Sequence, residues 1–240
     1  MLTVTNRGSY RERLIPAKAL PVFPAPPYQD AYPCMLPDGD YLELPFLPLP
    51  PDFESAIAFL CSNQTSFAVE DRLSTHMAHL AAALNPDVVV GMPTLGMVYA
   101  ASVARKLGHE RYVPLGYSRK FWYDEALSVP VRSITSPVKP KQVYLDPKML
   151  ERLNGKRVLL VEDVISTGGT ISAEIQLMEK IGANVVGIVT AVKETNVWVE
   201  KLAAIAPQWP EKVHAPIKCP LFRKSTDGWT PDPHTYPPGS

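Results

Sequence analysis

The chain has 240 residues, of which 46% are hydrophobic and 20% are charged, a composition typical of a globular protein with one large domain or two small ones. Lysine plus arginine and aspartate plus glutamate both number 24, so the formal charge is zero and no global field favours a nucleic-acid or anionic membrane partner. The N-terminus lacks an apolar signal core and no apolar run approaches membrane-spanning length. Cys34, Cys61 and Cys219 fit neither a disulfide framework nor a zinc site, so we expect a reduced, cytoplasmic protein.

Proline is concentrated at both ends of the chain, in residues 1–52 and 207–240. These ends also carry large apolar residues such as Tyr28, Phe46 and Trp229, which are uncommon in solvated tails. We therefore expect an N-terminal segment over 1–65 and a C-terminal segment over 207–240 to form ordered coil and short strands. Both would contribute to a small hood that folds against a core over 66–206.

Strand and helix patterns alternate along the core. Helices are predicted at 53–61, 67–84, 95–107, 168–181 and 196–206, and strands at 88–90, 112–115, 156–161, 185–192 and 212–217. This alternation predicts an α/β fold with a central, mostly parallel sheet and helices on both faces. In such sheets, ligands bind at the carboxyl ends of the strands.

Residues 117–155 interrupt the alternation. The segment is long and rich in charged and aromatic side chains, and compact domains seldom carry such a connection without a function. We expect a flexible hairpin or lid over 117–150.

The stretch VLLVEDVISTGGT, residues 158–170, joins a predicted strand to a predicted helix. A helix N-terminus presents free N–H groups and partial positive charge, and the glycines and hydroxyls of residues 166–170 suit an oxyanion. The acids Glu162 and Asp163 would repel a phosphate but can accept hydrogen bonds from vicinal hydroxyls. The combination predicts a site for a ribose 5-phosphate. Walker A and dinucleotide-binding patterns are absent, and the alternative is that the acids cap a helix and the glycines form a tight connection.

This stretch resembles the phosphoribosyl pyrophosphate (PRPP) signature of the type I phosphoribosyltransferases, with the orotate and adenine enzymes most similar. The resemblance implies that Glu162 and Asp163 hold the ribose hydroxyls, with Asp163 also counted as catalytic. The other PRPP-binding residues in this stretch would be Val164, Ser166, Thr167, Gly168, Gly169 and Thr170. Enzymes for 6-oxopurines carry an aspartate at the position of Ser166, so this serine argues against that subgroup.

A second loop follows the predicted strand at 88–90. In the family this loop binds pyrophosphate through backbone amides and often has an unusual peptide geometry, which implies roles here for Thr94, Leu95 and Gly96. Relatives often carry lysine or arginine where Leu95 lies. The alternative is an ordinary strand-to-helix turn.

Two cations begin the predicted lid. By the same resemblance, Arg119 and Lys120 would neutralise the leaving pyrophosphate and are assigned as catalytic. Beyond Lys120 the sequence departs from both the orotate and the adenine patterns, which leaves the acceptor base open. The alternative is two surface cations without a role.

The implied reaction displaces pyrophosphate from C1 of PRPP by a ring nitrogen of a nucleobase. Mg²⁺ is the expected cofactor, bound mainly through PRPP, with Glu162 and Asp163 as the candidate side-chain ligands. We expect a homodimer with small-molecule substrates and with neither nucleic acid nor membrane as partner. The rival hypotheses are a PRPP- or nucleotide-sensing regulator of the same fold without turnover, and a sugar-phosphate hydrolase.

Overall fold

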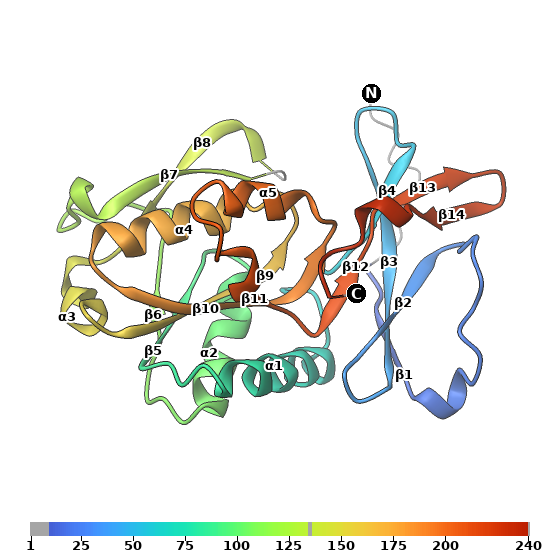
Figure 1. Cartoon of the computed structure of the whole chain (residues 1–240), viewed down its shortest axis with the longest axis horizontal. Helices are drawn as coiled ribbons and strands as arrows, with labels where there is room; N and C mark the ends of the chain where they lie inside the picture. The colour runs from blue at the N-terminus through green and yellow to red at the C-terminus, as the bar shows by residue number, and fades with distance from the viewer. Residues whose placement is uncertain (1–9, 134–135, 240) are drawn as a thin grey trace.

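The computed structural model of the protein describes residues 10–133 and 136–239 (Figure 1). A parallel sheet lies at the centre of its larger part. Its strands follow the order β11-β10-β9-β5-β6, with β12 also paired to β10. Their bounds are β5 (Val88–Gly91), β6 (Val113–Pro114), β9 (Arg157–Ile165), β10 (Asn184–Glu194), β11 (Val213–His214) and β12 (Ile217–Cys219). The prediction of a central parallel sheet is confirmed.

Helices cover both faces of this sheet, as predicted. Leu159 and Val161 of β9 pack in one apolar cluster with α1 (Phe67–Ala82) and α2 (Gly96–Lys106). Val158 and Leu160 pack in a second cluster with α4 (Gly169–Lys180) and α5 (Val197–Ala203). Successive residues of a strand point to opposite faces, so this continuous aliphatic run suits a strand that is buried on both sides. A short helix, α3 (Leu150–Leu153), precedes β9.

A second sheet is built from both ends of the chain (Figure 1). Its strands run in the order β1-β3-β4-β13-β14, with β2 paired to β3, and every pair is antiparallel. Their bounds are β1 (Arg13–Ile15), β2 (Ala31–Met35), β3 (Tyr41–Leu49), β4 (Ser55–Ala58), β13 (Phe222–Ser225) and β14 (Gly228–Pro231). We call this the terminal sheet.

The predicted helix at 53–61 is wrong, because this segment contains strand β4. Ala56 and Ala58 are fully buried, whereas Ser55 and Ile57 between them are partly exposed. That alternation has the period of a strand. Pairing of β4 with β3 on one side and β13 on the other overrides the local helical propensity.

The segment between β6 and α3 contains an antiparallel hairpin of β7 (Ser128–Ser133) and β8 (Ser136–Tyr144). Val129, Val131 and Val143 belong to the same apolar cluster as α4, so the base of the hairpin packs on the helix that follows the signature stretch. Short 3-10 turns occur elsewhere, at Ala17–Ala19, Glu125–Leu127, Pro147–Met149, Pro210–Lys212 and Pro233–Thr235.

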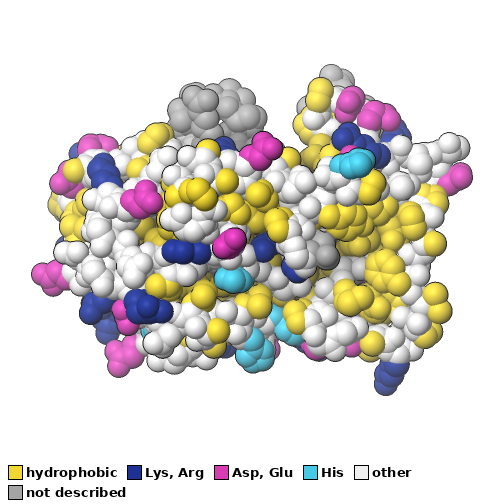
Figure 2. Space-filling view, in the orientation of Figure 1, with side chains coloured by type: hydrophobic (Ala, Val, Ile, Leu, Met, Phe, Trp, Pro, Cys, Tyr) yellow, Lys and Arg dark blue, Asp and Glu magenta, His cyan; other side chains and the backbone are white. Residues whose placement is uncertain are grey.

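Hydrophobic side chains are exposed around the terminal sheet, among them Val22, Phe23, Met35 and Leu47. Figure 2 shows this apolar surface at the right of the view, while charged side chains are more frequent over the central sheet. Within the described ranges, no helix has both the length and the apolar character needed to cross a membrane.

Candidate active site

The candidate site lies where the chain leaves two neighbouring strands in opposite directions. Strand β5 leads through α2 to β6 on one side, and β9 leads through α4 to β10 on the other. Open parallel sheets bind ligands in the crevice at such a switch of direction, so we take the carboxyl ends of β5 and β9 as the candidate crevice. The two loops predicted from the sequence both begin there.

The two loops meet at Gly96, the first residue of α2. A Cβ atom at this position would lie 2.8 Å from Oε1 of Glu162 and 2.9 Å from the carbonyl oxygen of Val161. Only glycine fits without displacing the signature strand. Met92 N also donates to the Val161 carbonyl at 3.2 Å. The peptide bond between Pro93 and Thr94 is cis, an unusual geometry of the kind that the resemblance implied for this loop.

The acid pair lies inside β9, whereas the sequence placed it after a strand ending at Val161. Pairing with β10 continues through Glu162 and Val164 opposite Thr190 and Val192, and this pairing carries the strand to Ile165. Glu162 is 4% exposed, and its Oε1 accepts a hydrogen bond from Asp163 N at 3.0 Å. Glu162 therefore has little access to bulk water, whereas Asp163 is partly exposed.

Burial is the main cause of the altered acidity of this pair. It raises the pKa of the Glu162 carboxyl well above its ordinary value, and the negative charge of Asp163 adds to the effect. Burial also raises the pKa of Asp163, while hydrogen bonding with the Glu162 side chain and with backbone amides opposes that rise. A ligand that donates hydrogen bonds to these carboxylates would favour their charged forms.

The loop that joins β9 to α4 is held in place by contacts with Ser172, Thr195 and Trp198. Gly168 has a φ of 73°, and a Cβ atom there would lie 3.1 Å from Cβ of Trp198. Ser172 Oγ donates to the Gly168 carbonyl at 2.7 Å, and Thr195 Oγ1 donates to the Ser166 carbonyl at 3.4 Å. These contacts fix the loop at the N-terminus of α4, and free amides at a helix N-terminus suit an anion.

Sequence reasoning missed Glu194, the last residue of β10. Its side chain is hydrogen-bonded to that of Ser166, and burial raises the pKa of the Glu194 carboxyl to about 8. Ser62 and Tyr99 were missed as well, although both lie close enough to Asp163 to influence or feel its charge. An acid at the end of an otherwise aliphatic strand was the available signal for Glu194. Ser62 carries no comparable signal, because its approach depends on how the terminal sheet meets the core.

The lid cations are not in contact with the acid pair in this structure. Arg119 Nε forms an ion pair with Glu125 Oε1 at 2.8 Å, and both side chains are more than half exposed. Lys120 is exposed. Tyr117, in the same segment, is partly buried: burial raises its pKa to about 12, and the charges of Glu162, Glu174 and Asp163 contribute. The roles of Arg119 and Lys120 stay predictions.

Metal-ligating side chains are sparse. In the part of the chain that the structure describes, no three or more His, Cys, Asp or Glu residues are grouped so that they could hold a metal ion. Glu162 and Asp163 offer the hard oxygen atoms that Mg²⁺ prefers, but two side chains do not complete its coordination. The donor set therefore fits an ion that arrives with an oxygen-rich ligand.

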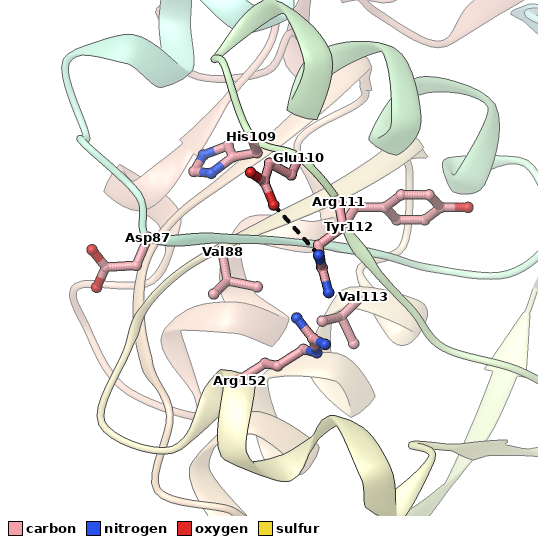
Figure 3. Close-up of a pocket in the computed structure, with 8 residues that line it drawn as sticks. All are labelled: Asp87, Val88, His109, Glu110, Arg111, Tyr112, Val113 and Arg152. Carbon is pink, nitrogen blue, oxygen red and sulfur yellow. Dashed lines mark hydrogen bonds and ion pairs between the residues drawn. The ribbon is translucent and has the colours of Figure 1, made fainter.

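A separate cavity of about 380 Å³ lies at the opposite, amino-terminal ends of β5 and β6. It is lined by Asp87, Val88, His109, Glu110, Arg111, Tyr112, Val113 and Arg152 (Figure 3). Its guanidinium and carboxylate groups are mixed, with Arg111 Nη2 3.4 Å from Glu110 Oε2. Its position at the far end of the strands separates it from the candidate site.

Comparisons with known proteins agree with this geometry. Residues 63–212 match the family model described as the phosphoribosyl transferase domain. The adenine phosphoribosyltransferase of Novosphingobium aromaticivorans is 30% identical over 142 residues, covering 56% of this chain and 74% of that protein. The adenine phosphoribosyltransferase of Nostoc punctiforme is 32% identical over 106 residues, covering 44% of this chain and 58% of that protein. The chain thus spans between about half and three quarters of these relatives.

Among solved structures, the adenine phosphoribosyltransferase of Giardia lamblia, in complex with 9-deazaadenine, shares the fold. It superimposes with a TM-score of 0.51 at 21% sequence identity, over 62% of this chain and 78% of that one. None of these matches supports the regulatory alternative. The matched region contains α1, α2 and α4, the strands from β5 to β10 and both loops of the crevice. The chain therefore belongs to the phosphoribosyl transferase family, as its signature stretch predicted.

Proposed function

We propose that this protein transfers the ribose 5-phosphate of PRPP to a nitrogenous base and releases pyrophosphate, with adenine as the preferred acceptor. The observation that carries the proposal is the meeting of the two loops at Gly96 and Glu162, where a glycine is sterically required. One bound molecule can then contact both loops. Adenine is favoured over orotate because the similar proteins named above are adenine phosphoribosyltransferases.

In this proposal, three groups of residues bind three different parts of PRPP. Glu162 and Asp163 accept hydrogen bonds from the 2- and 3-hydroxyls of the ribose. The loop of residues 166–170 and the first amides of α4 bind the 5-phosphate. Backbone groups of Thr94, Leu95 and Gly96 bind the pyrophosphate, at the start of α2. Val164 contributes through its backbone beside the acids.

Mg²⁺ belongs to the proposal as a cofactor that enters with PRPP. When bound, the ion supplies positive charge to the pyrophosphate oxygens as this group leaves. Glu162 and Asp163 are the side chains that could complete its coordination. We also propose a homodimer in the cytoplasm that uses small-molecule substrates alone.

The lid is proposed to act by exchanging one anion for another. Arg119 is paired with Glu125 in this structure. Pyrophosphate carries more negative charge than a single carboxylate, so it would compete with Glu125 for Arg119 when PRPP is bound. Arg119 and Lys120 would then neutralise the leaving group, and the closed lid would exclude water from an oxocarbenium-like transition state. Most of the catalytic effect is therefore electrostatic and positional.

The decisive experiment measures pyrophosphate release with Mg²⁺, PRPP and a panel of adenine, guanine, hypoxanthine, xanthine, uracil and orotate. We expect turnover with adenine and little or none with the 6-oxopurines. PRPP binding without pyrophosphate release on any of these bases would contradict the proposal and would favour the regulator.

Asp163→Asn tests the ribose contact. Loss of the negative charge weakens the acceptor for the ribose hydroxyls, so we expect KM for PRPP to rise by about tenfold or more, as for loss of a charged hydrogen bond. Steady-state kinetics with varied PRPP measure the change. An unaltered KM and kcat would remove Asp163 from the site.

Lys120→Ala tests the lid separately. If the lysine neutralises charge that develops on the leaving group, kcat falls by roughly 10²-fold while KM for the base changes little. Lys180→Ala is the matched control, since Lys180 is an exposed lysine in the last turn of α4. Equal behaviour of the two variants would exclude Lys120 from catalysis.

A further inference from the structure

Two cysteines far apart in the sequence touch one another. Cys34 lies on β2 of the terminal sheet and Cys219 on β12 of the central sheet, 185 residues apart, and their Sγ atoms are 3.3 Å from one another. Both side chains are buried, at 1% and 0% exposure. A disulfide requires a sulfur separation near 2.05 Å, so closure by about 1 Å would suffice.

The contact is fixed by regular structure on both sides. Cys34 pairs with Leu42 of β3, and Cys219 pairs with Glu194 of β10. The carbonyl of Cys219 accepts a hydrogen bond from Thr195 N at 2.9 Å. Both thiols also belong to the apolar cluster that runs from the terminal sheet to α1 and α2. Ordered strands thus hold the two sulfur atoms together in the folded chain.

We propose that Cys34 and Cys219 can form a disulfide. The bond would covalently join β2 of the terminal sheet to β12, which pairs with the end of β10. In the reaction, two S–H bonds are lost and one S–S bond forms. The two protons and two electrons pass to a low-molecular-weight disulfide, which is reduced to two thiols. Reducing conditions return the pair to the free thiols found in the structure.

The third cysteine provides an internal control. Cys61 is buried as well, but its Sγ donates to Asn63 Oδ1 at 3.4 Å, and no sulfur contact involving it occurs in the described residues. Burial alone therefore does not distinguish the pair, whereas the sulfur contact does. Oxidation of the folded protein should consume Cys34 and Cys219 and leave Cys61 free.

The test is refolding from urea in a glutathione buffer, so that burial of the thiols does not limit access of oxidised glutathione. After refolding, free thiols are blocked with iodoacetamide under denaturing conditions and counted by intact mass. We expect three blocked thiols with reduced glutathione alone and one with the oxidising buffer. Peptide mapping should find Cys34 joined to Cys219.

Closing so long a loop restricts the unfolded chain, so the oxidised protein should melt roughly 5 to 15 °C higher than the reduced protein, reversibly with dithiothreitol. Cys61→Ser should retain this rise, and Cys34→Ser and Cys219→Ser should lose it. Three blocked thiols after oxidative refolding, a bond to Cys61 or a bond between two chains would each overturn the proposal. The thiol count on the unaltered chain decides the matter even if a serine variant fails to fold.

Discussion

At the scale of single residues, the site is distinguished by buried acids. Glu162, Glu174 and Glu194 are each at most 4% exposed, and burial raises the pKa of all three. Removing a carboxyl from water disfavours its charged form. These three buried acids lie where β9, α4 and β10 converge, so burial costs free energy there unless each carboxyl is protonated or hydrogen-bonded.

Glu194 should make stability depend on pH. Its pKa is about 8 in the folded protein, against an ordinary value of 4.5, so the folded state holds the proton more tightly. Its contribution is therefore complete below pH 4.5 and is lost as pH rises through 8. We expect the free energy of unfolding to fall between pH 5.5 and pH 8.5, and Glu194→Gln to reduce that fall by a few kcal/mol.

Urea denaturation at both pH values measures the effect. Glu211→Gln serves as control, because Glu211 is an exposed glutamate. If Glu194→Gln leaves the pH dependence unchanged, Glu194 titrates in the same range in the folded and unfolded chain. The Glu194 carboxyl would then be ionised at pH 7 and would accept the hydrogen bond from Ser166 as a carboxylate.

At the scale of elements, helix α4 serves two purposes that conflict. Its N-terminus forms part of the loop of residues 166–170, while its buried face packs under the β7–β8 hairpin. Glu174 lies on that buried face, fully buried, and among the described residues neither carboxyl oxygen has a hydrogen-bond partner. An unpaired buried carboxyl destabilises the helix contact.

Replacing Glu174 with leucine should stabilise the protein. The change removes an unpaired polar group and keeps a similar volume, so we expect the free energy of unfolding at pH 7 to rise by about 1–3 kcal/mol. Gln176→Leu, at an exposed position of the same helix, should change it by less than about 0.5 kcal/mol. Urea denaturation measures both. A loss of stability in Glu174→Leu would show that the carboxyl has a partner in solution.

At the scale of the whole molecule, the terminal sheet has an aromatic residue from the C-terminal part of the chain in its core. Phe222 is fully buried, and its ring lies 4.9 Å from Tyr32 and 4.8 Å from Phe46 between ring centroids. Its backbone pairs β13 with β4. The Phe222 side chain thus helps to join the C-terminal strands to the N-terminal ones, together with Trp229, whose ring lies 5.8 Å from that of Phe46.

Phe222→Ala should therefore lower the free energy of unfolding by about 3–5 kcal/mol, the usual cost of removing a buried aromatic ring. Phe121→Ala is the matched control, because Phe121 is 97% exposed and its loss should cost less than about 0.5 kcal/mol. Denaturant unfolding followed by circular dichroism compares them. Similar midpoints for the two variants would mean that the terminal sheet is not part of the cooperative unit.

Much of the central sheet and the loop of residues 166–170 was predictable from the sequence. Their signals are local: aliphatic runs with the period of a strand, helical spacing, and small residues at a strand-to-helix junction. The length of β9 was not predictable, because its last residues are strand only through pairing with β10. The same reason explains the failure at β4. Glu194 beside Ser166 and Cys34 beside Cys219 arise from contacts between distant segments, which no local pattern encodes.

The terminal sheet also bears on the order of synthesis. Arg223 of β13 donates a hydrogen bond to Ser55 of β4 at 3.1 Å, although 168 residues separate them. During translation, β3 and β4 therefore leave the ribosome long before β13 is made. The edge of β4 that pairs with β13 stays unpaired while the entire central sheet is translated. Non-local pairing of this kind forms late and slowly. We therefore expect chaperones to bind the N-terminal strands of the nascent chain.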